Sequence, residues 1–437
     1  MFDFMKQTII NTRTLACFAV ASCLSPSLTA EPASDSIFPE SFILDTNLEY
    51  SKEMLSAQRT VVNKVPYLLE SYESGLLEPG KIYLSGHAIY SQYHEKTDTD
   101  GKFPILGRFP GQHSSGTSAD ESILDVADVS LTYAANDWVS VFVHGIYTDL
   151  QFPTQEEAQI REAFITFGNL AESPWYLSVG RMTANFGHQG SYNPITHSVN
   201  NHFFRIDSDD AAVELGYIGE DWRFAFTALN GGRQLRVADN PNNSFGSNFA
   251  ISTQYDTELA GWDVSVGGGY LYSSIYDSDS ANHPGVAPDP LTTRERNGLL
   301  NTWVEAKKGP YSIMAEYTQT ERDWPATAPA PAPPTFRVSK GAAVQGLTLQ
   351  AAYDTEILSK DTRFSLVYGK GILGNDGDEW ENLQQIAAGA EVYITDNFAL
   401  SLEYVYNRSF IPLIKLDRTA IRDVDTETFI ISGTLFF

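Results

Sequence analysis

One stretch is enough to indicate the fold: Trp222-Arg223-Phe224-Ala225-Phe226-Thr227-Ala228. Large aromatic residues occupy every second position, and small or polar residues stand between them. Successive side chains of a β-strand point to opposite faces, so this strand would have one apolar and one polar face. A second stretch has the same period: Phe398, Leu400, Leu402, Tyr404 and Tyr406 alternate with Ala399, Ser401 and Glu403.

The period of two continues from Lys81 to the C-terminus in about 16 segments, each near the roughly 9–11 residues that a tilted membrane-spanning strand needs. Short and long connections alternate between the segments. The short ones are expected near 135–137, 169–173, 219–221, 257–261, 308–310, 356–361 and 395–397. The long ones are expected near 97–119, 150–158, 187–208, 231–246, 277–296, 321–342, 371–381 and 409–424. This pattern predicts an all-β fold, a transmembrane antiparallel β-barrel of the Gram-negative outer membrane that crosses it many times.

Aromatic residues support this interpretation because they recur at one end of every second strand. Directly after short connections come Trp138, Trp175, Trp222, Trp262, Tyr311 and Phe398. Aromatic rings prefer the membrane–water boundary, so these positions predict an aromatic girdle at the periplasmic side. The last segment alternates to a terminal Phe437, which resembles the signal that the barrel insertion machinery reads.

The first 30 residues predict a secretory signal peptide. Lys6 and Arg13 precede an apolar run from Leu15 to Leu24, and small residues up to Ala30 suit cleavage there. A lipoprotein cleavage site ending at Cys23 is the alternative. Both cysteines, Cys17 and Cys23, lie in this segment, so cleavage after Ala30 would leave no disulfide and no cysteine-ligated metal.

Residues 31–80 form a separate expected segment, periplasmic and helical, ahead of a barrel at 81–437. Leu48, Leu55, Val62 and Leu69 fall seven residues apart, and Pro66 interrupts the pattern. The alternatives are an amphipathic helix against the periplasmic mouth of the barrel and a short oligomerising coiled coil. No plug-like domain is expected before the first strand.

Composition narrows the partners. A net charge of −26 argues against nucleic acid. The mean hydropathy of −0.22 suits a barrel, because lipid-facing and lumen-facing residues average out along each strand. We expect contact with outer-membrane lipid and a small solute as the passenger. A homo-oligomer is possible, since lipid-facing and subunit-facing apolar residues look alike.

Charged residues within the strands should face the lumen, because lipid accepts charge only at high cost. Nine acids are assigned there: Asp128, Glu162, Glu214, Asp263, Glu305, Glu316, Asp354, Glu391 and Glu403. Three bases and two histidines join them: Arg223, Lys307, Arg363, His87 and His144. These charges either solvate the wall and pair across strands, or form a field that disfavours small anions.

The long connection at 187–208 has an unusual composition. It holds His188, Asn193, Pro194, His197, Asn200, Asn201, His202, Phe203, Phe204 and Arg205. Three interpretations remain open: a loop that folds inward and narrows the channel, an ordinary surface loop, and a metal or chelate site. Histidines without fixed short spacing are a weak ligand signal, so we predict no metal and no cofactor.

Catalytic motifs are sparse. The sequence has no Gly-rich phosphate loop, no Gly-x-Ser-x-Gly and no His-Glu-x-x-His. We therefore expect a channel and not an enzyme.

Three runs resemble the central signature of the LbtU-type siderophore porins. They are Arg161-Glu162-Ala163-Phe164-Ile165-Thr166-Phe167-Gly168-Asn169, Ser173-Pro174-Trp175-Tyr176-Leu177-Ser178-Val179-Gly180-Arg181 and Asn185-Phe186-Gly187. The resemblance extends over about 120–437. It implies an outer-membrane channel for iron acquisition that imports a ferric siderophore without the plug domain of energised receptors.

The runner-up is a phosphate-selective, anion-selective or general diffusion porin, since phosphate-selective porins have a similar Gly-Arg…Phe-Gly strand end. A structural or adhesive barrel that acts through its surface loops is the second class. Asn193-Pro194-Ile195-Thr196 resembles the loop that follows this signature in the siderophore porins. Arg181 at the strand end and Asn193 and Arg205 in the loop are therefore the first candidates for a ligand site. The other candidate pore residues are His197, His202, Arg223, Glu305, Glu316, Arg363 and Glu403.

Overall fold

The computed structural model describes residues 43–56, 63–108, 113–149, 157–206, 211–230, 244–276, 296–324, 342–377, 381–410 and 421–437. The expected signal peptide lies outside these residues. Among the described residues, no helix is long and apolar enough to cross a membrane.

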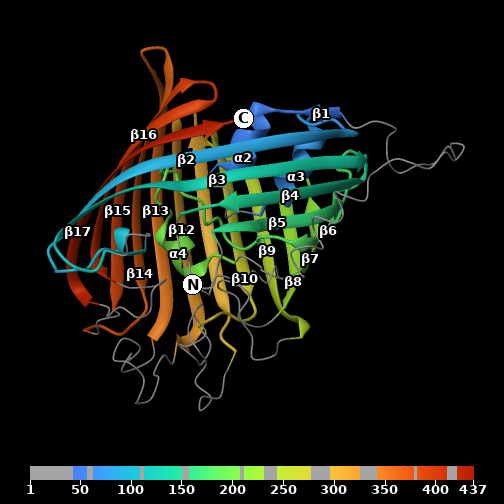
Figure 1. The fold of residues 1–437 in the computed structure, drawn as a ribbon. Coiled ribbons are helices and arrows are strands. Elements are labelled where there is room, and N and C mark those ends of the chain that lie inside the picture. Colours follow the sequence, from blue (N-terminus) through green and yellow to red (C-terminus); the bar gives the residue numbers. More distant parts are fainter. Residues whose placement is uncertain are drawn as a thin grey trace, which may run out of the picture. The chain divides into compact units, whose positions relative to one another are not determined.

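Sixteen strands close into one antiparallel barrel (Figure 1). Each strand pairs with the next in the chain, and the last pairs with the first. The first eight are β2 (Lys81–Thr97), β3 (Ser118–Asn136), β4 (Val139–Tyr147), β5 (Ala158–Phe167), β6 (Trp175–Arg181), β7 (Ala212–Ile218), β8 (Trp222–Asn230) and β9 (Phe245–Leu259). The others are β10 (Trp262–Leu271), β11 (Leu299–Lys308), β12 (Tyr311–Trp324), β13 (Ala342–Ile357), β14 (Lys360–Ile372), β15 (Asn382–Thr395), β16 (Phe398–Phe410) and β17 (Ile421–Phe436). The predicted fold class and strand number are confirmed.

The alternation of short and long connections is also confirmed. The short connections gather at one end, which we call the short-turn end, and the long ones at the other, the long-loop end. Several short connections are tight hairpins. In Ala260-Gly261 and Leu358-Ser359 both residues have positive φ, a geometry whose twist matches that of the flanking strands.

The closing seam is completed by the C-terminus and by a short additional strand. Phe437 exchanges two backbone hydrogen bonds of 2.9 Å with Gly86. Beyond that point β17 has ended, and β1 (Ile43–Asp45) pairs in parallel with the first residues of β2. The chain therefore covers an edge that would otherwise present unpaired backbone groups.

Side chains alternate as the sequence predicts. On β3, Val129 and Leu131 are 50% and 45% exposed on the outside, whereas Ser130 and Thr132 are 1% and 0% exposed inside. Trp138, Trp175, Trp222 and Tyr311 are exposed at the short-turn end. A closed barrel with an apolar outer belt and a polar interior satisfies its backbone internally and is built for lipid, so the chain is an outer-membrane-type barrel.

Three helical elements and one 3₁₀ turn complete the described structure. Two are the helices α2 (Leu48–Leu55) and α3 (Val65–Glu73), followed by η1 (Leu106–Arg108) in the first long loop and α4 (Val199–Phe204) in the third. Figure 1 shows α2 and α3 within the barrel near the end where β1 and the C-terminus lie. The interior is therefore partly filled.

Candidate permeation site in the barrel lumen

The described residues of 43–80, which we call the lumen insert, enter the short-turn end of the barrel. Asn47 caps α2 by accepting a hydrogen bond of 3.0 Å from the Tyr50 amide. Pro66 lies in the first turn of α3, where its missing N–H costs nothing. Of the expected heptad, Leu48 and Leu55 lie in α2 and Leu69 in α3, whereas Val62 lies outside the described residues. The two helices lie inside the short-turn end of the lumen and not merely against the periplasmic mouth (Figure 1).

Polar contacts of the lumen insert reach four strands in three parts of the wall. The Tyr50 hydroxyl lies 2.8 Å from Thr132 Oγ1 on β3. Asn63 donates to Glu214 on β7 at 2.9 Å and to the Thr183 carbonyl at 2.8 Å. On β8, Arg223 lies 2.6 Å from Glu70. Lys52 lies 4.3 Å above the ring of Tyr393 on β15. The lumen insert therefore spans the interior from one side of the wall to the other.

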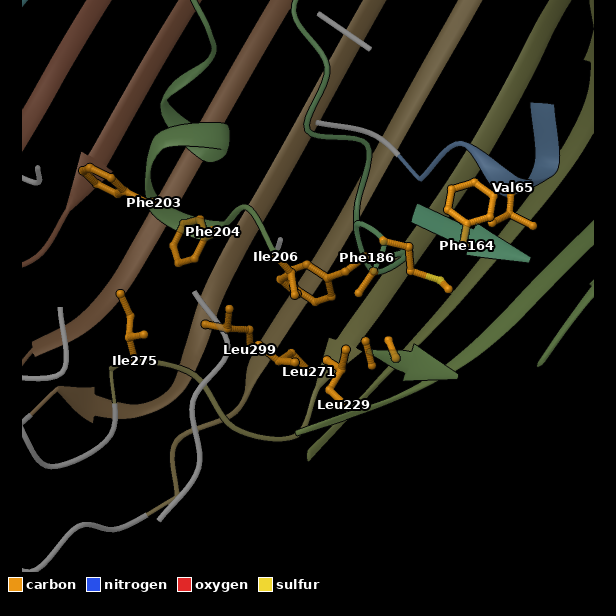
Figure 2. Packing of buried hydrophobic residues seen from close by; sticks show 14 of the residues in the cluster. Val65, Phe164, Phe186, Phe203, Phe204, Ile206, Leu229, Leu271, Ile275 and Leu299 are labelled. Atoms are coloured by element: carbon orange, nitrogen blue, oxygen red, sulfur yellow. The ribbon is translucent and has the colours of Figure 1, made fainter. Parts of the chain in front are cut away.

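Apolar packing holds the lumen insert against β2 and β4–β6. The side chains of Tyr50, Leu55, Val65 and Leu68 are fully buried. They belong to one cluster with wall residues that include Tyr83, Phe142, Phe164 and Tyr176. Figure 2 shows Val65 beside Phe164 in this cluster. Burial of each such side chain removes apolar surface from water and contributes on the order of 1.5–3 kcal/mol.

The third long loop, residues 187–206, folds into the lumen, which settles the choice between an inward and a surface loop. We call it the inward loop. Glu316 on β12 accepts hydrogen bonds from the amides of His188 and Gln189 at 2.8 and 3.1 Å. On β16, Glu403 accepts from the amides of Ile195 and Thr196 at 3.0 and 3.1 Å. Each of these two side chains accepts from two consecutive backbone amides, so together they fix the loop at two points.

Gln350 on β13 adds a third attachment between the two carboxylates. Its oxygen accepts from the Tyr192 amide at 2.6 Å, and its nitrogen donates to the Gly190 carbonyl at 2.8 Å. The chain leaves the wall after Arg181, which is why β6 and β7 are only 7 residues long.

Glycines on the wall make room for α4. A Cβ at Gly346 would overlap Asn200, one at Gly369 would reach Val199 at 2.5 Å, and one at Gly371 would overlap Phe203. The side chains of Val199, Phe203 and Phe204 are buried. Figure 2 shows Phe203 and Phe204 projecting from the helix beside the barrel wall. Glycine in a strand often marks such a close approach.

The first long loop, like the inward loop, is held by a wall glutamate that accepts hydrogen bonds from its backbone amides. Glu95 on β2 is fully buried and accepts hydrogen bonds from the amides of Ile105 and Leu106 at 3.2 and 2.7 Å. Phe103 and Leu106 are buried in a second apolar cluster that also includes Val405 and Ile430 of the wall. Three wall glutamates therefore each hold two consecutive backbone amides of a segment inside the barrel.

A cavity of about 660 Å³ remains between the lumen insert, the inward loop and the wall. Tyr192, Asn193 and Pro194 line it from the loop, and Lys52, Ser56 and Tyr67 from the lumen insert. Its acids are Glu53, Glu70, Asp256, Glu305 and Glu391, and its bases are Lys52, Arg223, Lys307 and Arg363. The cavity is polar and of mixed charge.

Each wall cation of this cavity has a carboxylate partner. Arg363 contacts Asp354 through two hydrogen bonds of 2.6 and 2.8 Å. Lys307 lies 2.9 Å from Glu305. Arg223 lies between Glu70 and Asp256, at 2.6 and 3.5 Å. The cavity therefore presents ion pairs to a solute and not a ladder of basic side chains.

A further set of titratable groups is buried between the lumen insert and β2–β5. His87 and His144 lie 3.5 and 3.3 Å from Asp128. His144 is also 3.5 Å from Glu162, and Lys64 of the lumen insert lies 4.0 Å from the same carboxylate. The predicted lumen position of these wall residues is confirmed by their burial.

The structure brings four of the ten candidate ligand residues together at the cavity and places the other six elsewhere. Asn193, Arg223, Glu305 and Arg363 line the cavity. Glu316 and Glu403 instead hold the inward loop. Arg205 is buried, and Arg181 lies at the end of β6. His197 and His202 face each other with ring centroids 6.3 Å apart. No group of three or more His, Cys, Asp or Glu suited to a metal ion occurs within the described ranges.

The sequence analysis did not identify Glu95, Gln350 or the lining residues of the lumen insert. The alternation of β2 predicts that Glu95 faces the lumen, but it does not predict that the amides of Ile105 and Leu106 are its partners. Glu70 gave a weak indication of a site, because it is a charged residue that directly follows the apolar positions Tyr67, Leu68 and Leu69.

No protein-family model matches the chain, and no curated protein matches its sequence. Solved structures match its fold. The outer membrane channel DcaP of Acinetobacter baumannii is 14% identical, with a TM-score of 0.52 over 82% of this chain and 97% of that one. OmpT, an outer membrane protein of Vibrio cholerae, is 12% identical, with a TM-score of 0.51 over 82% and 97%. OprB of Pseudomonas putida is 9% identical, with a TM-score of 0.51 over 81% and 94%. The chain therefore has the fold of outer-membrane porins.

Proposed function

We propose that this chain is an outer-membrane channel through which a small polar solute diffuses, and that the solute is a ferric siderophore. The observation that carries the proposal is the cavity of about 660 Å³ inside a closed, lipid-facing barrel. Its wall offers charged, hydroxyl and aromatic groups together, which suits a large polar chelate more than a simple ion. The resemblance of residues 161–187 to siderophore porins supports the same solute class.

The anion-selective alternative has one argument in its favour: an anion-selective porin from Comamonas acidovorans shares the fold, at 9% identity and a TM-score of 0.50. The ion pairs argue against it here. Arg223, Lys307 and Arg363 are each matched by a carboxylate within 2.9 Å. A selective anion path needs basic side chains whose charge is available to the solute.

Planar-bilayer conductance of the refolded full chain tests the proposal. The probes are a ferric hydroxamate, a ferric catecholate and a ferric hydroxycarboxylate, each compared with its metal-free chelator and with inorganic phosphate. Block by at least one ferric complex, and not by its metal-free form, is the expected result. Block by phosphate alone would indicate that the protein is an anion channel. A protein that inserts without conducting would be a structural or adhesive barrel.

A further inference from the structure

The lumen insert and the inward loop line the same cavity from opposite sides. Lys52, Ser56 and Tyr67 approach it from the short-turn end, and Tyr192, Asn193 and Pro194 from the other. Porin-type barrels are usually described by their wall and their loops. Here a segment that precedes the first strand contributes side chains to the same space.

The contacts of the lumen insert make it a fixed part of the barrel. Its hydrogen bonds to Thr132 and Glu214 are buried, and so is its apolar face. Breaking one such bond would leave a buried polar group unsatisfied, which costs free energy. Its attachments reach β3, β7, β8 and β15, so a solute that traverses the lumen has to pass beside it.

We infer that the lumen insert is a selectivity element: it forms one wall of the permeation path, and its side chains select the charge of the permeating solute. The inference rests on the proposed channel function. Lys52 and Glu53 contribute one charge of each sign to the lining of the cavity, to which Glu391 of the barrel wall also belongs. A change of charge on the lumen insert should therefore act on a permeating ion as directly as a change on the wall.

Cysteine labelling in the full chain tests this inference with a matched pair of positions. Ser56 ends α2 and lines the cavity, so Ser56→Cys places a thiol there with little change of volume. Thr46 lies in the same segment but is exposed and does not line the cavity. Thr46→Cys is the control, and the wild-type protein controls for Cys17 and Cys23.

Single-channel currents are recorded before and after an anionic and a cationic methanethiosulfonate. We expect both reagents to reduce the conductance of Ser56→Cys. The anionic tag should move the reversal potential toward cation selectivity and the cationic tag toward anion selectivity, whereas Thr46→Cys stays unchanged. A purely structural role would not give shifts of opposite sign.

Three results would overturn the inference. Suppose that Ser56→Cys channels conduct and are labelled, but that their conductance and reversal potential do not change. The permeation path would then lie away from the lumen insert. A rise in conductance with either reagent would mean that the segment obstructs the path and is displaced. Wild-type protein that does not conduct would refute the proposed channel function and this inference with it, which distinguishes that failure from the other two.

Discussion

The lumen insert and the inward loop occupy opposite sides of the same lumen, but they are held in different ways. The lumen insert presents fully buried Tyr50, Leu55 and Leu68 to an apolar part of the wall. Between residues 188 and 196 the inward loop is fixed through its backbone amides by Glu316 and Glu403.

The difference is one of directionality. Apolar burial is proportional to area and tolerates small shifts of a helix, so it supplies stability more than exact position. Hydrogen bonds to carboxylates act at a defined amide and fix the register of a segment that has no regular structure. The inward loop has no regular structure between residues 188 and 196 and depends on the second kind of attachment. The helices of the lumen insert combine apolar burial with a few side-chain hydrogen bonds.

Removal of apolar volume from the lumen insert should have the largest effect. In Leu68→Ala the α3 helix loses a fully buried side chain, which costs about 2–5 kcal/mol for a buried leucine. The amides of residues 65–73 should exchange with deuterated water much faster, because local opening of the helix becomes easier. Hydrogen–deuterium exchange of the refolded protein measures this.

The control for that variant is Leu44→Ala in β1, whose side chain is 65% exposed. Its exchange profile over 65–73 should match the wild type. Equal protection of α3 in Leu68→Ala and in the wild type would mean that apolar packing does not hold the lumen insert, and the comparison between the two regions would fail.

Sequence patterns predicted the barrel wall well because alternation is a local property. The period of two alone predicts that Ser130 faces the lumen and Val129 the outside. It predicts the same division for Glu403 and Leu402. The long-range attachments could not be predicted. Glu403 and Thr196 are 207 residues apart, and Glu316 and His188 are 128 apart. A carboxylate that only faces water in the lumen and one that accepts hydrogen bonds from a loop occupy the same kind of position in the strand pattern. The sequence therefore cannot distinguish them.

The position of the lumen insert could not be predicted from the sequence for a similar reason. A weak heptad with a proline fits a helix at the mouth, a coiled coil and a helix pair inside the barrel. The choice depends on whether the facing wall is apolar. Phe142, Phe164 and Tyr176 are inward residues of β4–β6 that make it so, and each looked unremarkable within its own strand.

Loss of one carboxylate should have an intermediate and more local effect. Glu316→Ala removes the acceptor for two amides of the inward loop, and unsatisfied buried donors cost about 1–3 kcal/mol. Single-channel recordings should show added current noise as the loop fluctuates at residues 188–189, with the barrel still intact. Exposed Glu356→Ala, at a short turn, provides the control and should leave the current quiet.

Glu316→Gln distinguishes the charge from the acceptor. An amide oxygen can still accept from one backbone amide but makes a weaker bond than a carboxylate, so its noise should fall between wild type and Glu316→Ala. Noise in Glu316→Gln as large as in Glu316→Ala would show that the ionised group, and not the acceptor alone, fixes the loop.

The smallest effect is expected where α4 meets the glycine-lined wall. A Cβ at Gly371 would overlap the ring of Phe203, and Gly371→Ala should force the ring to shift at a cost of about 1–3 kcal/mol or less. Gly145→Ala is the matched control, since a Cβ there meets only carbonyl oxygens at 3.9 Å or more.

The two variants are compared by the temperature at which the folded band on a semi-native gel is lost. Gly371→Ala should lower it slightly and Gly145→Ala should not. Phe203→Leu combined with Gly371→Ala should restore it, because a smaller side chain no longer meets the added methyl. Unchanged stability in both Gly371→Ala and the double variant would mean that the packing of α4 on the wall contributes nothing, and the inward loop would then be held by its polar contacts alone.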